Sequence, residues 1–355
     1  MALPRLVIGD LTIPIPIIQG GMGIGVSLAG LASAVADAGG VGVISAAGIG
    51  GEESDFKSNY ITANSRALRR EIREARGRTS GVLGVNIMVA LTNYADLVQV
   101  SVEEGIDIIF SGAGLPLDLP RHLAGKTSPK LVPIVSSGRA ATVICKKWRS
   151  RFDRLPDAFV VEGPMAGGHL GFKPDQIANE NFRLERLVPE VITAVAAFDP
   201  SIPIIAAGGI YTGADIRKYL DMGAKAVQMG TRFVATHECD AAPAFKQAYV
   251  DAKKEDMHII KSPVGLPGRV IRNTFIDKVE DGKRCPFSCP FHCLRGCEYT
   301  SSPFCITLAL LNAKRGNMDN GLIFAGENAW RVTGIVSVAE LFAELINDYD
   351  ATFHA

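Results

Sequence analysis

This sequence of 355 residues lacks the features that mark a protein acting on nucleic acid or in a membrane. Lys and Arg number 37 and Asp and Glu also number 37, so the formal net charge is zero, and no run of like charge suggests an anionic polymer or a lipid surface as partner. No basic segment followed by an apolar one opens the chain, and no uncharged stretch is long enough to span a bilayer. We therefore expect a cytoplasmic protein with a small-molecule substrate. The oligomeric state is open, with a homodimer as one expectation.

Cysteine is sparse over most of the chain but clustered near the C-terminus. Five of the seven cysteines lie within 21 residues: Cys285, Cys289, Cys293, Cys297 and Cys305. A reducing cytoplasm disfavours disulfides, which leaves metal ligation or reduced thiols packed in a small subdomain. The first four, spaced by three residues each, with Cys305 as an alternate, could hold a zinc ion or an iron–sulfur cluster. The spacing leaves both interpretations open.

What the chain has in abundance is a repeated unit of apolar strand, glycine-rich or polar exit and amphipathic helix. Eight apolar segments fit this unit: 15–23, 42–48, 82–87, 106–112, 131–137, 158–163, 203–209 and 226–231. Helical periodicity follows in 28–38, 65–76, 94–104, 139–147, 187–198 and 213–222. Eight such units predict an α/β fold, a (β/α)8 TIM barrel with its active site at the carboxyl ends of the strands.

An open doubly wound sheet is the rival fold. It would bind a dinucleotide at the glycines that follow the first strand, Gly20 to Gly25. The acidic residue that should follow about 20 positions later is missing, because Asp37 lies inside the predicted helix. The barrel is therefore favoured.

The regular pattern stops after Thr231. Prolines and the clustered cysteines occupy the stretch up to residue 318, and an amphipathic helix is predicted at 338–348. We interpret residues 1–235 as the barrel, 236–318 as an inserted, mainly helical subdomain that walls the substrate site, and 319–355 as a segment that packs back on the barrel.

The ends of the last two strands carry neighbouring glycine-rich turns that suit a phosphate group. Gly208 and Gly209 end one strand, and Gly230 and Thr231 end the next. A single phosphate, without a P-loop or a dinucleotide fingerprint, suits flavin mononucleotide (FMN). Residues at the other strand ends are candidate contacts of the flavin ring: Gly20, Gly21, Met22, Asn86, Ser136 and Gln228.

A glycine-dense turn after the sixth strand carries one imidazole. Ala166, Gly167 and Gly168, which are further candidate flavin contacts, precede His169, and such a turn can bring a base close to a flat cofactor. A solvated histidine on a surface loop is the competing interpretation.

These elements resemble the nitronate monooxygenase (2-nitropropane dioxygenase) family from residue 10 to residue 235. The resemblance rests on the segments 19–23, 84–86, 165–171, 207–210 and 228–233. The family also includes FMN-dependent enoyl-acyl-carrier-protein reductases with a similar Ala-Gly-Gly-His-x-Gly element. The resemblance implies the same barrel and FMN site.

The resemblance also implies that His169 is the general base or proton donor above the flavin ring. In the nitronate branch, a nitroalkane is deprotonated or its anion is bound directly, and dioxygen converts it to a carbonyl compound and nitrite. In the reductase branch, NAD(P)H reduces FMN, which reduces a conjugated double bond. Neither branch needs the cysteine segment, and an iron–sulfur cluster there would favour electron transfer through the protein. A non-catalytic barrel that binds flavin or a phosphorylated metabolite is the alternative from another class, and a sugar-phosphate isomerase on the same barrel is a further one.

Overall fold

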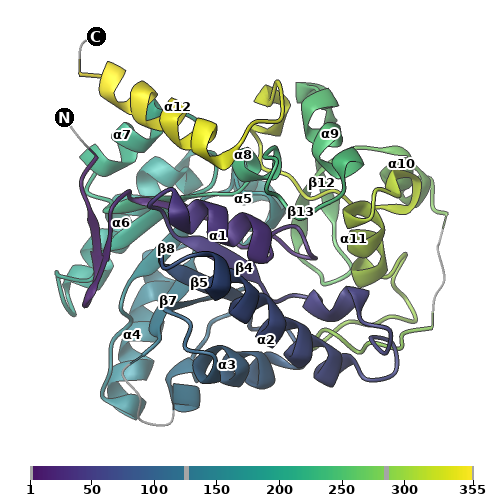
Figure 1. The fold of residues 1–355 in the computed structure, drawn as a ribbon, viewed down its shortest axis with the longest axis horizontal. Helices are drawn as coiled ribbons and strands as arrows, with labels where there is room; N and C mark the ends of the chain where they lie inside the picture. Colours follow the sequence, from purple (N-terminus) through teal and green to yellow (C-terminus); the bar gives the residue numbers. More distant parts are fainter. Residues whose placement is uncertain (1–2, 124–127, 284–287, 354–355) are drawn as a thin grey trace.

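The computed structural model describes residues 3–123, 128–283 and 288–353. At its centre lies an eight-stranded parallel sheet that curves into a nearly closed barrel (Figure 1). The strands are β3 (Ile17–Gln19), β4 (Gly42–Ser45), β5 (Leu83–Met88), β6 (Ile108–Gly112), β7 (Lys130–Val135), β8 (Phe159–Glu162), β10 (Ile204–Ala207) and β11 (Ala226–Met229). Their order in the sheet is β3-β11-β10-β8-β7-β6-β5-β4. The eight predicted strands and the predicted barrel are confirmed.

The side chain and backbone of Gln19 join the first strand to the second. The Gln19 N–H donates to the carbonyl of Val41 at 3.0 Å, and the Val43 N–H donates to Gln19 Oε1 at 2.9 Å. A parallel bridge between Ile18 and Val41 completes the junction. Because Gln19 is fully buried, its amide satisfies backbone groups that would otherwise be unpaired where the two strands meet.

A short N-terminal hairpin fills the end of the barrel where the strands begin. It consists of β1 (Leu6–Ile8) and β2 (Leu11–Ile13). Leu6, Ile8 and Ile13 are fully buried among the inward-facing side chains of the strands. Nearby, Lys130 at the start of β7 pairs with Asp10 at 2.5 Å. One end of the barrel is thereby closed, and the carboxyl ends of the strands form the other.

Helices cover the outside of the barrel and follow the strands in the predicted order. They are α1 (Ala29–Asp37), α2 (Tyr60–Arg78), α3 (Tyr94–Glu103), α4 (Gly138–Phe152), α6 (Leu184–Ala196), α7 (Gly213–Asp221) and α12 (Val338–Ala351). The hydroxyls of Ser137, Thr212 and Ser337 accept hydrogen bonds from the first turns of α4, α7 and α12, as N-caps do. The final helix lies against α7 and α1 (Figure 1), so it takes the place of the eighth barrel helix although a long segment separates it from β11.

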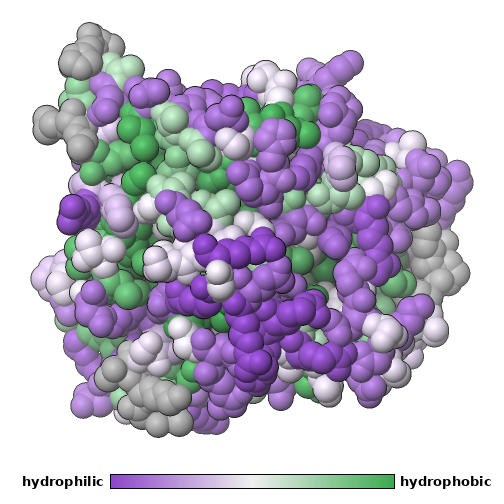
Figure 2. Space-filling model, in the orientation of Figure 1, coloured by the Kyte–Doolittle hydropathy of each residue, from purple (hydrophilic) through white to green (hydrophobic). Residues whose placement is uncertain are grey.

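The face over α2 and α3 is strongly hydrophilic (Figure 2). Arginines of α2 form ion pairs there with Glu103 and Glu104 at the end of α3, including Arg69 with Glu103 at 2.7 Å and Arg73 with Glu104 at 2.6 Å. Exposed pairs of this kind contribute little to stability individually. They leave this side of the barrel as a solvated surface.

Between β11 and α12 the chain leaves the barrel and builds a layer over its open end. This segment contains α8 (Thr231–Val234), α9 (Pro243–Asp251), β12 (Met257–Lys261), β13 (Pro267–Ile271), α10 (Thr274–Glu280) and α11 (Ile306–Lys314). The loop after β8 contributes β9 (Gly168–His169) and α5 (Pro174–Ile177). A small sheet with the order β12-β13-β9 joins this segment to the loop after β8. Short 3-10 helices are η1 (Ile49–Glu52), η2 (Leu119–Leu123), η3 (Glu180–Phe182), η4 (Lys254–Asp256), η5 (Met318–Asn320) and η6 (Ala329–Arg331).

No helix in the described part of the chain combines the length and the apolar character needed to cross a membrane.

Candidate active site

One large cavity of about 1070 Å³ opens at the carboxyl ends of the barrel strands. The exits of β3, β5, β7, β8, β10 and β11 form its floor, and the inserted segment forms its roof. The structure places every predicted flavin-contact residue and the predicted catalytic residue on its wall. They are Gly20, Gly21, Met22, Asn86, Ser136, Ala166, Gly167, Gly168, His169, Gly208, Gly209, Gln228, Gly230 and Thr231. Their proximity in the structure makes joint action feasible, and their individual roles stay predictions.

His169 projects from β9 into this cavity, between Ser262 of the inserted segment and Phe324 of the segment that follows it. Its Nε2 lies 2.7 Å from the hydroxyl of Ser262, and its ring meets Phe324 edge-on at a centroid distance of 4.9 Å. Within the described residues no carboxylate pairs with the ring, and burial lowers the pKa of His169 to about 4. The imidazole is therefore neutral at pH 7 and able to accept a proton.

Glu162, the last residue of β8, is a second titratable group on the cavity wall. Burial raises the pKa of its carboxyl group to about 7, because a low-dielectric environment disfavours the charged form. Sequence reasoning did not single it out as a site residue. One acidic residue at the end of an apolar run was the available signal, and its burial was not visible in the sequence.

Two amide side chains lie where the first strand ends. A Cβ atom added to Gly21 would be 2.3 Å from Cβ of Asn86, and one added to Gly20 would be 3.6 Å from Nε2 of Gln228. Neither amide group has a hydrogen-bond partner among the described residues, and both line the cavity. Both residues are partly buried, so their amide groups are open to pairing with the carbonyl and nitrogen edge of a bound flavin ring.

The turn after β10 is fitted to close contact with a phosphate group. Gly208 and Gly209 have φ angles of +96° and +85°, which side chains other than glycine rarely adopt. A Cβ on Gly208 would also approach the carbonyl oxygen of Gly163 to 2.9 Å. The neighbouring turn at Gly230 and Thr231 lines the same end of the cavity. These features fit the phosphate of FMN.

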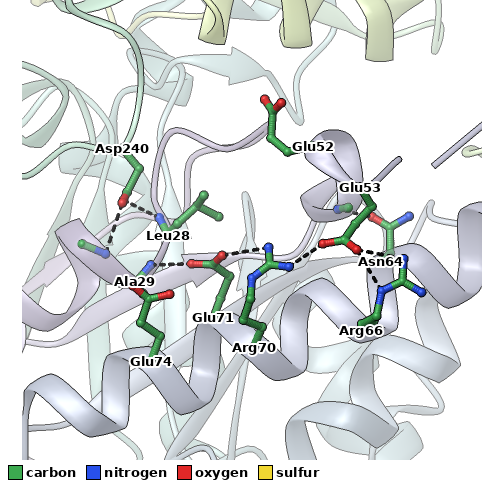
Figure 3. A network of polar contacts seen from close by, with 12 residues as sticks. Leu28, Ala29, Glu52, Glu53, Asn64, Arg66, Arg70, Glu71, Glu74 and Asp240 are labelled. Atoms are coloured by element: carbon green, nitrogen blue, oxygen red, sulfur yellow. Dashed lines mark hydrogen bonds and ion pairs between the residues drawn. The ribbon is translucent and has the colours of Figure 1, made fainter. Parts of the chain in front are cut away.

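The N-terminus of α1, where the rival fold would bind a dinucleotide, is already occupied by the protein's own carboxylates (Figure 3). Asp240 accepts hydrogen bonds from the N–H groups of Leu28 at 2.7 Å and Leu31 at 3.1 Å. Glu71 of α2 accepts one from Ala29 at 3.1 Å. An anion at this helix end would meet two carboxylates, so the structure agrees with the barrel interpretation.

The cysteine segment borders the cavity but does not form a metal site in the part of the chain that the structure describes. Cys293 lines the cavity and its Sγ lies 3.1 Å from the hydroxyl of Thr307. Burial, with a smaller contribution from the neighbouring thiols Cys305, Cys289 and Cys297, raises the pKa of Cys293 to about 11. No group of three or more His, Cys, Asp or Glu residues there is placed to hold a metal ion. Cys285 lies outside the described residues, and metal binding stays a prediction.

Two further residues of the site were missed from the sequence. Ser262 and Phe324, which contact His169, lie 93 and 155 positions after it in the chain. They come from a stretch without a repeating pattern. No sequence signal links them to the imidazole, because their proximity depends on the pairing of β13 with β9.

The geometry defines a barrel enzyme with one cavity of cofactor size and a neutral imidazole on its wall. Residues 5–348 match the family model described as nitronate monooxygenase. The chain therefore belongs to the nitronate monooxygenase family, and the family assignment supports FMN as its cofactor.

Individual relatives differ in their named activities. A nitronate monooxygenase of Pseudomonas aeruginosa is 30% identical over 372 residues, which cover 94% of this chain and 95% of the relative. A (3aS,4S,5R,7aS)-5-hydroxy-7a-methyl-1-oxo-octahydro-1H-indene-4-carboxyl-CoA dehydrogenase of Mycobacterium tuberculosis is 29% identical over 269 residues, 76% of this chain and 66% of that protein. The chain thus spans just under two thirds of the length of this dehydrogenase, and 65% of its counterpart in Rhodococcus jostii. The solved structure of FabK from Thermotoga maritima is similar with a TM-score of 0.74 at 30% identity, covering 96% of this chain and 94% of FabK.

Proposed function

We propose that this protein is an FMN-dependent oxidoreductase that converts alkyl nitronates to carbonyl compounds and nitrite, with His169 as the base that forms the nitronate from a nitroalkane. The observation that supports this proposal is the state of the imidazole. It lies in the cavity, it is neutral at pH 7 because burial lowers its pKa to about 4, and a neutral imidazole can take a proton from a carbon acid.

Several groups in and around the cavity have a part in this reaction. The turns at Gly208 and Gly230 would hold the phosphate, and the amides of Asn86 and Gln228 would hold the edge of the ring. Ser262 orients the imidazole through its hydrogen bond, and the Phe324 ring packs against the imidazole. The proton leaves the α-carbon of the nitroalkane and is held on His169.

The overall reaction balances with dioxygen as the oxidant. A nitronate, dioxygen and water give the carbonyl compound, nitrite and hydrogen peroxide, so the two electrons lost by the nitronate reduce dioxygen. Bound FMN supplies the electron transfer between the two. The residues of the chain supply the proton acceptor and the orientation.

Reduction of a conjugated double bond is the second candidate function, favoured by the size of the cavity. A volume of about 1070 Å³ lies at the upper limit for ligand sites, which leaves room for a molecule larger than a simple nitronate beside a flavin. Apolar side chains of the inserted segment, including Leu294 and Leu310, also line the cavity. A thioester with an apolar acyl chain would fit this part of the cavity.

The test is a comparison of the two reactions on the FMN-loaded protein. Nitrite release from ethyl nitronate and from nitroethane is measured in air, and NADH- or NADPH-dependent reduction of a trans-2-enoyl thioester is measured without oxygen. We expect nitrite from both nitro substrates, and loss of the nitroethane reaction in His169→Asn. Thioester reduction without nitrite release would replace the first function by the second. No turnover of either kind, with FMN bound, would leave a binding protein.

A further inference from the structure

The glycine-dense turn that carries His169 has little preference for one conformation of its own. Between the end of β8 and His169 it contains three glycines, Gly163, Gly167 and Gly168, and glycine loses more backbone freedom on folding than any other residue. A base that removes a proton from carbon must be held to within a fraction of an ångström. Another part of the protein therefore has to fix this turn.

A buried arginine of the inserted segment contacts the turn directly. Arg269 lies on β13 and is 4% exposed. Its Nη1 donates to the carbonyl oxygen of Pro164 at 2.5 Å and to that of Ala166 at 2.7 Å. Its backbone is paired with Gly168 through the β13–β9 ladder. One residue thus holds both the start and the end of the turn.

An ion pair completes the arrangement. Glu327 Oε2 lies 2.8 Å from Nε of Arg269, and the Glu327 N–H donates to the carbonyl of Met165 at 3.1 Å. The carbonyl oxygens of three consecutive residues, 164, 165 and 166, therefore all accept hydrogen bonds from this pair. Charge-assisted hydrogen bonds are stronger and more directional than neutral ones, so the pair specifies the path of the turn and not merely its burial.

The segment around Glu327 also reaches the turns at the phosphate end of the cavity. The Gly326 N–H donates to the Thr231 hydroxyl at 3.3 Å, and Nδ2 of Asn328 donates to the carbonyl of Gly209 at 2.6 Å. A Cβ on Gly167 would come within 2.6 Å of the Gly326 nitrogen, so the two stretches lie flat against one another.

We infer that Arg269, paired with Glu327, is a positioning residue that sets the His169 turn for proton abstraction. This inference rests on the proposed function for its kinetic consequence and on the contacts above for its structural one. It assigns the inserted segment a part in the chemistry beyond enclosing the substrate.

The test compares Arg269→Gln with Arg272→Gln. Arg272 lies just past the same strand, is 48% exposed and pairs with Asp277 at 2.7 Å, so its replacement controls for loss of an arginine near β13. Both variants are loaded with FMN and assayed on nitroethane, which must lose a proton, and on ethyl nitronate, which has already lost it. We expect Arg269→Gln to slow the nitroethane reaction about 100-fold and to leave nitronate turnover within a factor of about three of wild type. Arg269→Lys should recover part of the loss, and Arg272→Gln should behave as wild type.

Equal loss on both substrates, or loss of FMN binding, would show a general structural role and overturn the inference, as would wild-type activity in Arg269→Gln. If that variant does not fold, Glu327→Gln decides in the same way, because it keeps the backbone contact to Met165 and changes a partly exposed side chain (36%). There we expect a selective loss on nitroethane of about tenfold, and equal or no loss overturns the inference.

Wild-type protein that releases no nitrite from either substrate would refute the proposed function and not the role of Arg269. Hydrogen–deuterium exchange then decides the matter. Faster exchange of the amides of residues 165–170 in Arg269→Gln than in Arg272→Gln supports the inference, and equal exchange overturns it.

Discussion

The pH dependence of nitroalkane oxidation separates a buried neutral imidazole from an ordinary one. Burial lowers the pKa of His169 to about 4, whereas an unperturbed histidine titrates at about 6.5. At pH 5.5 an ordinary histidine is neutral in about one tenth of the molecules, and one with a pKa of about 4 is neutral in about 97%. We expect nitrite release from nitroethane to change little between pH 7 and pH 5.5 and to decline only as the pH approaches 4.

The assay needs two controls, one for the protein and one for the substrate. Glu162 has a pKa raised to about 7, so any inflection it causes should disappear in Glu162→Gln. Ethyl nitronate needs no proton removed, so its turnover should not show the inflection of His169. A midpoint near 6.5 on nitroethane that persists in Glu162→Gln would refute the reasoning, because it would show an imidazole in contact with water.

The same pKa shift has a consequence for stability. The folded state holds the His169 proton less tightly than the unfolded chain, so the contribution of this residue to the free energy of unfolding rises with pH between about 4 and 6.5, by at most roughly 3 kcal/mol. Glu162 has the opposite effect: because its pKa is raised in the folded state, its contribution to the free energy of unfolding falls as the pH rises from its unfolded pKa to about 7. Urea unfolding at several pH values should therefore show that, with increasing pH, the free energy of unfolding of His169→Gln rises less, or falls more steeply, than that of wild type. Equal pH dependence of the two proteins would count against burial of the imidazole.

Ser262, Gly209 and Cys297 each give a further test of the site. Removing the hydroxyl in Ser262→Ala should cost about 1 kcal/mol, a roughly fivefold lower kcat on nitroethane with nitronate turnover unchanged, and an equal effect on both substrates would contradict its role at the imidazole. Gly209→Ala and Gly105→Ala both place a side chain at positive φ, which should lower the free energy of unfolding by about 1–2 kcal/mol in Gly105→Ala, where the new Cβ meets open space. The loss should be larger in Gly209→Ala, because its new Cβ would also lie 2.8 Å from Cβ of Met165. A fluorescence titration should show weaker FMN binding only for the first, and equal affinities would argue against a phosphate at that turn. Cys297 is partly exposed, whereas Cys145 is buried and has a pKa raised to about 11. Peptide mass spectrometry after iodoacetamide treatment should therefore find Cys297 modified before Cys145. Protection of Cys297 that a chelator removes would indicate a bound metal.

Much of the barrel was predictable because the patterns that specify its strands and helices lie within short stretches of the sequence. Parallel strands buried on both faces appear as apolar runs such as 204–207, and their exits need glycine where the backbone must turn close to a ligand. The helices show their period in the sequence, and the α7 N-cap at Thr212 follows a recognisable pattern. Because the carboxyl ends of parallel barrel strands meet at one end of the barrel, the predicted cofactor residues line one cavity.

The rest of the site depends on contacts between distant segments. Ser262, Arg269 and Glu327 reach the His169 turn only because β13 pairs with β9, and nothing in their local sequence encodes that pairing. The shift in the pKa of Glu162 is likewise a result of burial in three dimensions. Sequence patterns therefore singled out His169 and the glycine-rich turns that line the cavity, whose roles stay predictions, and the structure was needed to find the groups that contact them.

The absorption spectrum of the purified protein, with the released chromophore identified and iron and sulfide quantified, decides whether the barrel holds FMN. We expect flavin bands and FMN as the released chromophore, bound by the turns at Gly208 and Gly230 and the amides of Asn86 and Gln228. Iron and sulfide beside the flavin would assign the cysteine segment to a cluster and favour electron transfer over direct reaction with oxygen. A colourless protein that FMN does not reconstitute would contradict the account.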